Sequence, residues 1–396
     1  MPAPAKLNSE PTFAIVCDNG TGYVKCGFAG DTVPQSFPCM VGTSLTTAEA
    51  DGKPKEAVVG TACSENRHML DISYPISNGQ VQDWEGMFRV WDHTFEHVLK
   101  LDAAARSRTR ILLTEPPLNP LSNRRQMVDA MFRRYSFAGV QVQIQAVLTL
   151  YSQGLMTGLV VDIGDGVTHI IPVIHGCSFP HLTRRLNMAG RDVTARLVDL
   201  LQRRGYCFSA ASDFEAVRAI KERACYVAAD YQRELQLARE TTCLVQSYTL
   251  PDGRTIRVGG ECMMAPEVLF RPSLMDVEAP GVAEQVFQCI QDMDIDNRKD
   301  LYQNIVLSGG STMLPGLATR LQRAVTALYL KHILKGREEG LQKLRLRVLS
   351  SPHRKHVVFS GASVLADIMK DQENFWISRE EWAQNPQQAL KKCMQM

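Results

Sequence analysis

The apolar positions near the start of the chain fall into two short runs with a polar, glycine-rich segment between them. Phe13–Cys17 and Tyr23–Phe28 are rich in residues that favour strands, and Asp18–Gly22 separates them with an Asn-Gly pair. Asn-Gly is a strong hairpin signal, because both residues tolerate a positive φ. The pattern predicts a β-hairpin over residues 13–28, with an aspartate where its first strand ends.

The same order of segments recurs in the middle of the chain. Gly158–Val161 is apolar, Asp162–Gly166 is a glycine-rich turn, and Val167–Val173 is another apolar run. A repeat of strand, aspartate, glycine-rich turn and strand indicates two related structural units. We expect two lobes, each presenting one turn to a common cleft.

Helical and strand periods are mixed along the rest of the chain. Asn123–Tyr135, Phe214–Tyr231 and Leu317–Leu330 carry apolar residues at helical spacing. Ile111–Thr114 and Asn304–Leu307 are short apolar runs that predict buried strands. This mixture predicts an α/β or α+β class.

Composition excludes several classes of protein. The chain has 396 residues and a formal net charge of +2, too small to argue for nucleic acid. A single core stops growing near about 250–300 residues, so this length favours two lobes. The eleven cysteines include no Cys-x-x-Cys pair, which argues against a zinc site or a disulfide framework. No apolar run approaches the ~20 residues that span a bilayer, and no targeting segment is recognisable. We therefore expect a cytosolic protein without membrane insertion.

Three glycine-rich turns, each following an apolar strand, are the candidate chemistry. Successive backbone N–H groups in such a turn attract anions, so two facing turns would hold a polyphosphate from both sides. Asp18 and Asp162 suit a Mg²⁺ ion, which keeps most of its waters and is held by one or two carboxylates. Lys25 could reach a phosphate, and Ser308–Met313 opens towards a helix, which favours phosphate or ribose. One Asp-x-Gly turn is usually only a turn, but two matched turns and a third junction favour nucleotide binding.

These motifs resemble those of the actin family. Asp18–Lys25 is similar to the first phosphate loop, Asp162–His169 to the second, and Leu307–Met313 to the adenosine loop. The resemblance extends from about residue 13 to residue 382. It implies the α/β actin-like ATPase fold: two ribonuclease-H-like lobes around a nucleotide cleft, with four subdomains.

The resemblance also implies how the chain divides. Residues 1–152 and 353–396 would form the outer lobe, with a small subdomain at about 40–77. Residues 153–352 would form the inner lobe, with a subdomain at about 191–279.

Site roles carry over by the same resemblance. The implied cofactors are ATP, or ADP after hydrolysis, and Mg²⁺. Asp18, Gln145 and Asp162 would arrange waters around Mg²⁺, and Gln145 and His169 would position the attacking water. The residues expected to contact the nucleotide are Gly20, Thr21, Gly22, Lys25, Gly164, Asp165, Gly166, Val167, Arg218, Lys221, Glu222, Gly309, Gly310, Ser311, Thr312, Met313 and Lys355.

Three positions depart from the family pattern. Ile163 stands where the family usually has serine, so we expect a lost hydroxyl near the γ-phosphate and slow hydrolysis. Leu314 replaces an aromatic residue near the base, and Asn78 replaces a modified histidine.

Within the family, the motifs Thr114–Pro120, Pro180–Leu186 and Val258–Glu261 are most similar to an actin-related subunit of the complex that starts branched filaments. Thr43–Ala57 and the insertion-like segment Leu334–Val348 are changed at the surface. The implied partners are a second actin-related subunit, the other subunits of the branching complex, actin filaments and nucleation-promoting activators. The implied location is the cytoskeleton of the cytoplasm, at the cell cortex and in actin-rich structures. Sugar kinases and heat-shock ATPases share the fold. Within the family, a filament-forming actin and a nuclear subunit of a chromatin-remodelling complex are the alternatives.

Overall fold

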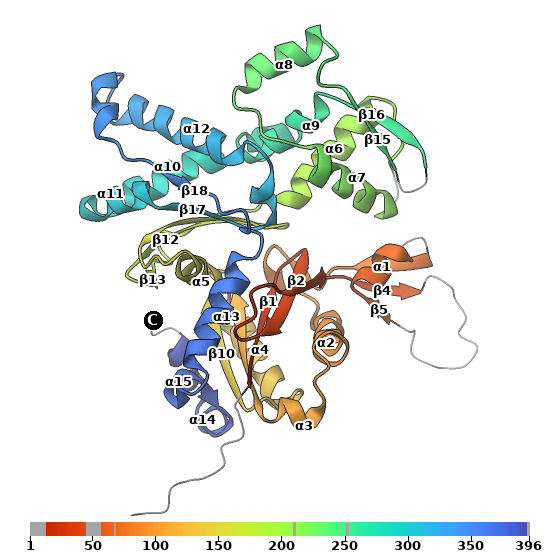
Figure 1. Ribbon diagram of the computed structural model, residues 1–396, viewed down its shortest axis with the longest axis vertical. Coiled ribbons are helices and arrows are strands. Elements are labelled where there is room, and N and C mark those ends of the chain that lie inside the picture. Colours follow the sequence, from red (N-terminus) through yellow and green to blue (C-terminus); the bar gives the residue numbers. More distant parts are fainter. Residues whose placement is uncertain (1–12, 45–56, 67–68, 209–210, 251–252, 394–396) are drawn as a thin grey trace, which may run out of the picture.

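The computed structural model describes residues 13–44, 57–66, 69–208, 211–250 and 253–393. They form a mixed α/β structure with two main sheets. Figure 1 shows the sheet that contains β1 in its lower half and the sheet that contains β12 in its upper half. None of the described helices combines the length and the apolar character that a membrane span requires.

The outer sheet has the strand order β19-β10-β9-β1-β2-β3. Strand β1 pairs antiparallel with β2 and parallel with β9, so the first predicted hairpin lies at its centre. The strands of this sheet are β1 (Phe13–Asn19), β2 (Tyr23–Phe28), β3 (Gln35–Pro38), β9 (Thr109–Glu115), β10 (Gly139–Ile144) and β19 (Ile377–Ser378).

Strand β1 is buried on both faces, and its residues alternate between two apolar clusters. Ala14 and Val16 pack with Phe359 of α13 (Val357–Met369), whereas Ile15 and Cys17 belong to the cluster on the opposite face. This alternation is the period of two expected for a strand. The continuous apolar run of the sequence therefore reflects a strand covered on both sides.

The inner sheet has the order β13-β12-β11-β17-β18, and β14 also pairs with β12. Its hairpin β11–β12 is antiparallel, and β11 pairs parallel with β17, as β1 does with β9. The strands are β11 (Gly158–Ile163), β12 (Thr168–Ile174), β13 (Cys177–Ser178), β14 (Arg184–Leu186), β17 (Ile305–Ser308) and β18 (Val348–Leu349).

Helix α5 (Gln145–Ser152) lies between the sheets. It begins where β10 ends, packs on α13, and shares an apolar cluster with Val160 and Ile171 of the inner sheet. The helix therefore packs between the two halves, as Figure 1 shows.

Most predicted elements are present, with one clear correction. The helix predicted over 214–231 is α7 (Ala211–Ala224), and a separate helix, α8, begins at Tyr231. The chain leaves the helix because the N–H of Val227 donates to the carbonyl of Pro315 at 2.8 Å, a long-range bond that replaces the helical one. Most of the predicted loop Thr43–Ala57, residues 45–56, lies outside the described residues.

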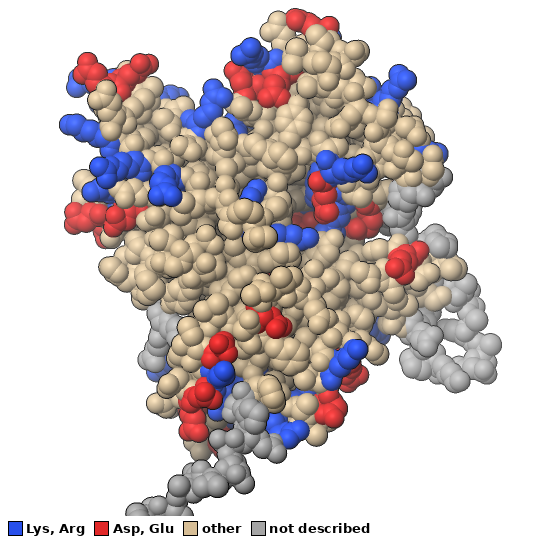
Figure 2. Space-filling model, in the orientation of Figure 1, with Lys and Arg blue, Asp and Glu red and all other residues tan. Residues whose placement is uncertain are grey.

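Smaller elements complete the structure. The short strands are β4 (Val41–Ser44), β5 (Ala57–Val59), β6 (Leu70–Ser73), β7 (Ile76–Ser77), β8 (Gln80–Val81), β15 (Gln246–Thr249) and β16 (Thr255–Val258). The other helices include α1 (Thr61–Glu65), α2 (Trp84–Asp92), α3 (Ala103–Arg106), α4 (Leu121–Arg133), α6 (Gly190–Arg203), α8 (Tyr231–Glu240), α9 (Glu261–Met264), α10 (Val282–Asp292), α11 (Ile295–Gln303), α12 (Leu317–His332), α14 (Arg379–Gln384) and α15 (Pro386–Ala389). The lobe boundaries expected at 152 and 353 stay predictions. On the face shown in Figure 2, acidic and basic side chains are interspersed over both halves.

Candidate functional site

The turn of the first hairpin is closed by its own backbone. The N–H of Gly20 donates to the carbonyl of Tyr23 at 3.1 Å. A Cβ at Gly20 would lie 2.7 Å from that carbonyl oxygen, so the turn needs glycine there. The strands leave Asp18 directly opposite Lys25, and the Lys25 ammonium lies 2.8 Å from the Asp18 carboxylate.

The second hairpin repeats this geometry. The N–H of Gly164 donates to the carbonyl of Val167, again at 3.1 Å. Asp162 lies opposite His169, the same place in the register that Asp18 and Lys25 occupy in the first hairpin. The repeat predicted from the sequence is therefore a repeat in three dimensions.

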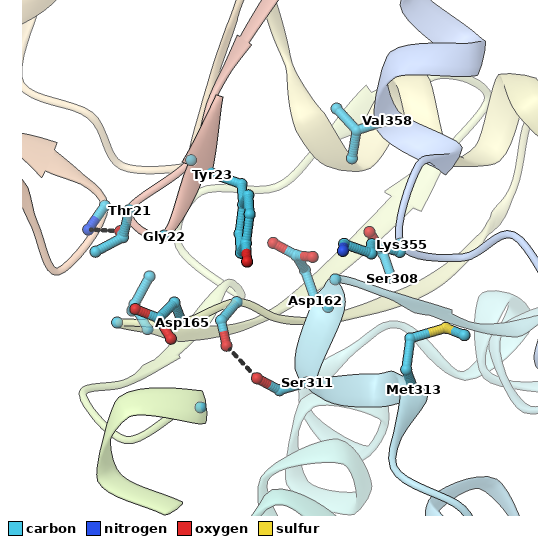
Figure 3. Close-up of a pocket in the computed structure, with 18 of the residues that line it drawn as sticks. Thr21, Gly22, Tyr23, Asp162, Asp165, Ser308, Ser311, Met313, Lys355 and Val358 are labelled. Carbon is cyan, nitrogen blue, oxygen red and sulfur yellow. Dashed lines mark hydrogen bonds between the residues drawn. The ribbon is translucent and has the colours of Figure 1, made fainter. Parts of the chain in front are cut away.

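The third turn is built against the second. Gly309 has a φ of +94°, and a Cβ there would lie 2.3 Å from the carbonyl oxygen of Ile163. The Ser311 hydroxyl donates to the carbonyl of Gly164 at 2.6 Å, a bond drawn in Figure 3. Glycine and serine at these positions let β17 pass directly into the short 3₁₀ helix Gly310–Met313 beside the turn.

The three turns surround one cavity of about 350 Å³. Figure 3 shows side chains from both lobes directed into it, with Thr21 and Tyr23 from the outer lobe and Asp162, Asp165 and Ser311 from the inner one. The predicted residues that line the cavity are Asp18, Gly20, Thr21, Gly22, Lys25, Gln145, Asp162, Gly164, Asp165, Gly166, Val167, His169, Arg218, Lys221, Glu222, Gly309, Gly310, Ser311, Met313 and Lys355.

Thr312 is the exception among the predicted residues, and its assignment is corrected. Its side chain is fully buried outside the cavity, and its hydroxyl donates to the carbonyl of Gly309 at 2.6 Å. Its own carbonyl accepts a hydrogen bond from Arg354 at 2.9 Å. Thr312 therefore holds the turn in shape, because three residues per turn of the 3₁₀ helix place its side chain on a different side from Ser311 and Met313, which line the cavity.

Sequence reasoning missed several residues that line the cavity. Tyr23 and Val358 extend into it in Figure 3, and Gly190 begins α6 beside it. Tyr23 follows Gly22 directly, at the place of Val167 in the second hairpin. The repeat itself was thus a usable signal for Tyr23. Other lining residues that were not assigned to the site are Asn19, Gly79, Pro116 and Val193.

The buried carboxylate of Asp18 is held in its charged form. Burial raises its pKa, but the charge of Lys25 and hydrogen bonds from Lys25, Thr114 and Gln145 oppose burial and leave the pKa below its usual value. The Gln145 amide donates to Asp18 at 3.1 Å. Asp18 and Gln145, predicted as partners of one cation, therefore lie in contact.

Asp162 has the opposite electrostatic balance. Burial raises its pKa, and the hydrogen bond from Ser308 and the more distant charge of Lys25 only reduce that rise. His169 opposite it has its pKa lowered to about 3, first by burial and then by the charge of Arg185. The imidazole is therefore neutral, and both of its ring nitrogens are buried without a hydrogen-bond partner in the described structure.

Helix α7 brings charge to the far wall of the cavity. Arg218 is 7% exposed, and its guanidinium lies 3.3 Å from Glu222 and 3.5 Å from Glu215. The Lys221 ammonium donates to the carbonyl of Gly190 at 2.8 Å, and burial lowers its pKa. The predicted trio therefore faces the cavity, and its exposed member is Glu222.

The expectation for Ile163 is corrected. Its side chain is fully buried in the apolar core of the inner lobe, on the same face of β11 as Val161, and it does not line the cavity. A hydroxyl at this position would point into that core. Strand alternation after the cavity-facing Asp162 is the physical reason.

Two features of the cavity suit a polyphosphate. Each turn has a glycine where it meets a side chain of the other: a Cβ on Gly22 would lie 2.9 Å from Cβ of Asp165, and one on Gly166 would lie 2.9 Å from Cγ2 of Thr21. Both ring nitrogens of His169 are buried without a hydrogen-bond partner in the described structure, which leaves them available to a ligand or a water. Within the described part of the chain, no three His, Cys, Asp or Glu side chains are grouped so as to hold a metal ion.

The fold and the site define a two-lobed α/β protein with paired glycine hairpins around an anion-binding cavity. A model of the family described as actin matches residues 9–394, and the chain belongs to the actin family. Among curated proteins, it is 58% identical over 385 residues to actin-related protein 2 of Arabidopsis thaliana. It is 57% identical, over the same length, to actin-related protein 2 of Oryza sativa subsp. japonica. In both comparisons the match covers 96% of this chain and 98% of the relative.

Proposed function

We propose that this chain binds Mg-ATP between its lobes and serves as the actin-related subunit that starts branched actin filaments. The observation that supports nucleotide binding is the pair of hairpins with equal register on opposite sides of one cavity. Each brings a glycine-rich turn and one aspartate, which is buried at Asp18 and half-buried at Asp162. No metabolic reaction is needed to explain such a site.

The binding roles follow from the groups that line the cavity. The turns at 20–22 and 164–166 would hold the phosphates through backbone N–H groups, and Lys25 would add its charge. Asp18, Gln145 and Asp162 would hold the waters of Mg²⁺, which supplies charge neutralisation when it is bound. The turn at 309–311, Met313 and Lys355 would enclose the nucleoside, with Arg218, Lys221 and Glu222 opposite.

Slow hydrolysis is the most that this site would support. Gln145 and His169 line the same cavity, and a neutral imidazole can accept a hydrogen bond from water. However, the Gln145 amide already donates to Asp18 at 3.1 Å. We infer that these residues orient a water rather than remove its proton.

Ligand-induced stabilisation tests the cleft directly. A ligand that binds only the folded state stabilises it by about 4 kcal/mol at a thousandfold excess over its Kd. Saturating Mg-ATP is expected to raise the melting temperature clearly. An unchanged melting temperature would sink the proposal of a nucleotide cleft.

Asp162→Asn tests whether Asp162 holds the cation or only shapes the turn. The change removes a charge and almost no volume. The affinity of the variant for Mg-ATP is therefore expected to fall much more than its affinity for ATP in the presence of a metal chelator. Titration of both ligands against the variant measures this. An equal loss would mean that Asp162 only shapes the turn.

The assembly role is supported by the names of the relatives and by the extent of the match. We infer partners accordingly: a second actin-related subunit, the other subunits of the branching complex, actin filaments and nucleation-promoting activators, in the cytoplasmic cytoskeleton. The changed surface around residues 334–348 would contact fixed partners, while the lobes keep the form of a filament subunit.

Sedimentation with Mg-ATP and salt distinguishes this role from its alternatives. The isolated chain is expected to stay in the supernatant, and to stimulate actin assembly only together with its partner subunits. Long homopolymers in the pellet would indicate a filament-forming actin. Co-purification from cells with a helicase-type ATPase would indicate a nuclear remodelling subunit.

A further inference from the structure

The ring of Tyr23 stands inside the cavity between two cations. The Arg218 guanidinium carbon lies 4.8 Å from the ring centroid, and the Lys355 ammonium lies 4.9 Å from it. Both distances fall within the about 6 Å over which a cation is attracted to an aromatic face. Figure 3 shows the ring edge-on, with its hydroxyl directed away from β2 into the cavity.

The two cations reach the ring from different elements of the structure. The Arg218 guanidinium would lie 3.3 Å from a Cβ on Gly22, which in turn would meet Asp165. In Figure 3, Gly22 and Asp165 lie on one side of the ring and Lys355 on the other. The ring is therefore in contact with two cations, 4.8 and 4.9 Å from its centroid.

The three residues belong to different parts of the molecule. Tyr23 begins β2 of the outer sheet, Arg218 lies on α7 of the inner half, and Lys355 lies just before α13. Two carboxylates anchor Arg218, whereas Lys355 forms no ion pair with any carboxylate that the structure describes. The ring therefore contacts an anchored cation of the inner half, Arg218, and an unpaired cation of its own half, Lys355.

We propose that Tyr23 is the latch of the cleft: its ring, which Lys355 of its own half also contacts, joins the lobes through Arg218, and the contact with Arg218 must break before the lobes part. This inference rests on the proposed function in one respect, that the ligand in the cleft is ATP. The latch slows the release of bound nucleotide. Val167, at the same place in the second hairpin, has no ring, so the latch is carried by the outer lobe alone.

Two substitutions of Tyr23 distinguish the contribution of the ring from that of its hydroxyl. Tyr23→Phe keeps the negative face of the ring, and Tyr23→Leu keeps an apolar side chain but removes that face. The release of fluorescent etheno-ATP, chased with excess ATP, is expected to be about three- to tenfold faster in Tyr23→Leu. Tyr23→Phe is expected to stay within about twofold of the parent protein.

Hydrogen exchange of the nucleotide-free protein gives a readout without any ligand. Peptides that cover residues 19–28 and 213–224 are expected to exchange several-fold faster in Tyr23→Leu than in the parent protein, and at the parent rate in Tyr23→Phe. Equal exchange in Tyr23→Leu and Tyr23→Phe would show that the face of the ring contributes nothing to the contact.

The outcomes keep the two proposals apart. If the parent protein binds no etheno-ATP, the proposed function fails, and hydrogen exchange alone decides on the latch. If the parent protein binds etheno-ATP, and Tyr23→Leu neither releases the nucleotide faster nor exchanges its amide hydrogens faster, the latch proposal is wrong while the proposal of a nucleotide cleft stands. Equal acceleration in Tyr23→Phe would assign the effect to the hydroxyl and would also overturn the latch.

Discussion

The two glycine-rich hairpins have the same backbone and opposite electrostatics. In each, the glycine after the strand donates to the carbonyl three residues later at 3.1 Å. In each, the aspartate accepts a hydrogen bond from a hydroxyl on the neighbouring parallel strand, that of Thr114 for Asp18 and that of Ser308 for Asp162. The shared features are those that a tight turn between paired strands requires.

The difference lies in the residue opposite each aspartate. Lys25 holds Asp18 as an anion with a pKa below its usual value, whereas the neutral His169 leaves the pKa of Asp162 raised by burial. One turn therefore carries its own counter-charge and the other does not. We conclude that backbone geometry and charge can change independently at a repeated site.

The largest expected loss of stability comes from breaking the charge pair of the first hairpin. Lys25→Met would leave the Asp18 carboxylate, which is 1% exposed, buried without its cation. Breaking a buried pair in this way costs about 3–5 kcal/mol. Urea unfolding measures the loss, and the double variant Lys25→Met/Asp18→Asn should recover most of it. A loss below about 1 kcal/mol in the single variant would contradict the assigned pairing.

Ile163→Ser tests the position that follows the aspartate of the second hairpin. Asn19 occupies the equivalent position in the first hairpin. The substitution removes buried apolar volume and places a hydroxyl in the inner core, so a loss of about 2–5 kcal/mol is expected. The matched control Ile163→Val should cost about 0.5–1.5 kcal/mol. Unaltered stability together with faster ATP hydrolysis would instead support the original expectation that a side chain at position 163 lies near the γ-phosphate.

Acid is expected to weaken the fold through the second hairpin. The pKa of His169 is about 3 in the folded protein, and an unfolded histidine has a pKa of about 6.5. Below pH 6.5 only the unfolded chain takes up this proton, so the stability from a neutral His169 is lost as pH falls towards 3. The loss amounts to about 2 kcal/mol between pH 6.5 and 5. Unfolding of the parent and of His169→Gln at both pH values measures it, and equal slopes would refute it.

The smallest expected effect compares the two equivalent glycines. A Cβ at Gly20 would lie 2.7 Å from a backbone oxygen, whereas one at Gly164 would lie at 3.4 Å, which needs little adjustment. Gly20→Ala is expected to cost about 1–3 kcal/mol, and Gly164→Ala about 1 kcal/mol or less in either direction. Melting temperatures of the two variants decide this, and the reverse order would show that the turns differ in backbone after all.

Much of the site could be predicted because its signals are local. The aspartate, the glycines and the flanking apolar runs stand within eight residues of each other in both hairpins, and a turn is determined over that distance. Ile163 could have been placed by the same local logic, since a strand residue after Asp162 faces the opposite way. Tyr23 could have been placed by comparing the two turns position by position.

The sequence by itself determined the elements around the site: two hairpins, a third turn that needs glycine at 309, and the class of the fold. It determined them because strand alternation and turn chemistry depend on neighbours in the chain. Only the tertiary structure decided that α7 ends at Ala224, that Thr312 is buried outside the cavity, and that Arg218 and Lys355 both contact the ring of Tyr23. Those outcomes depend on contacts between residues about 40 to 330 positions apart, and such contacts form only when distant segments have packed together.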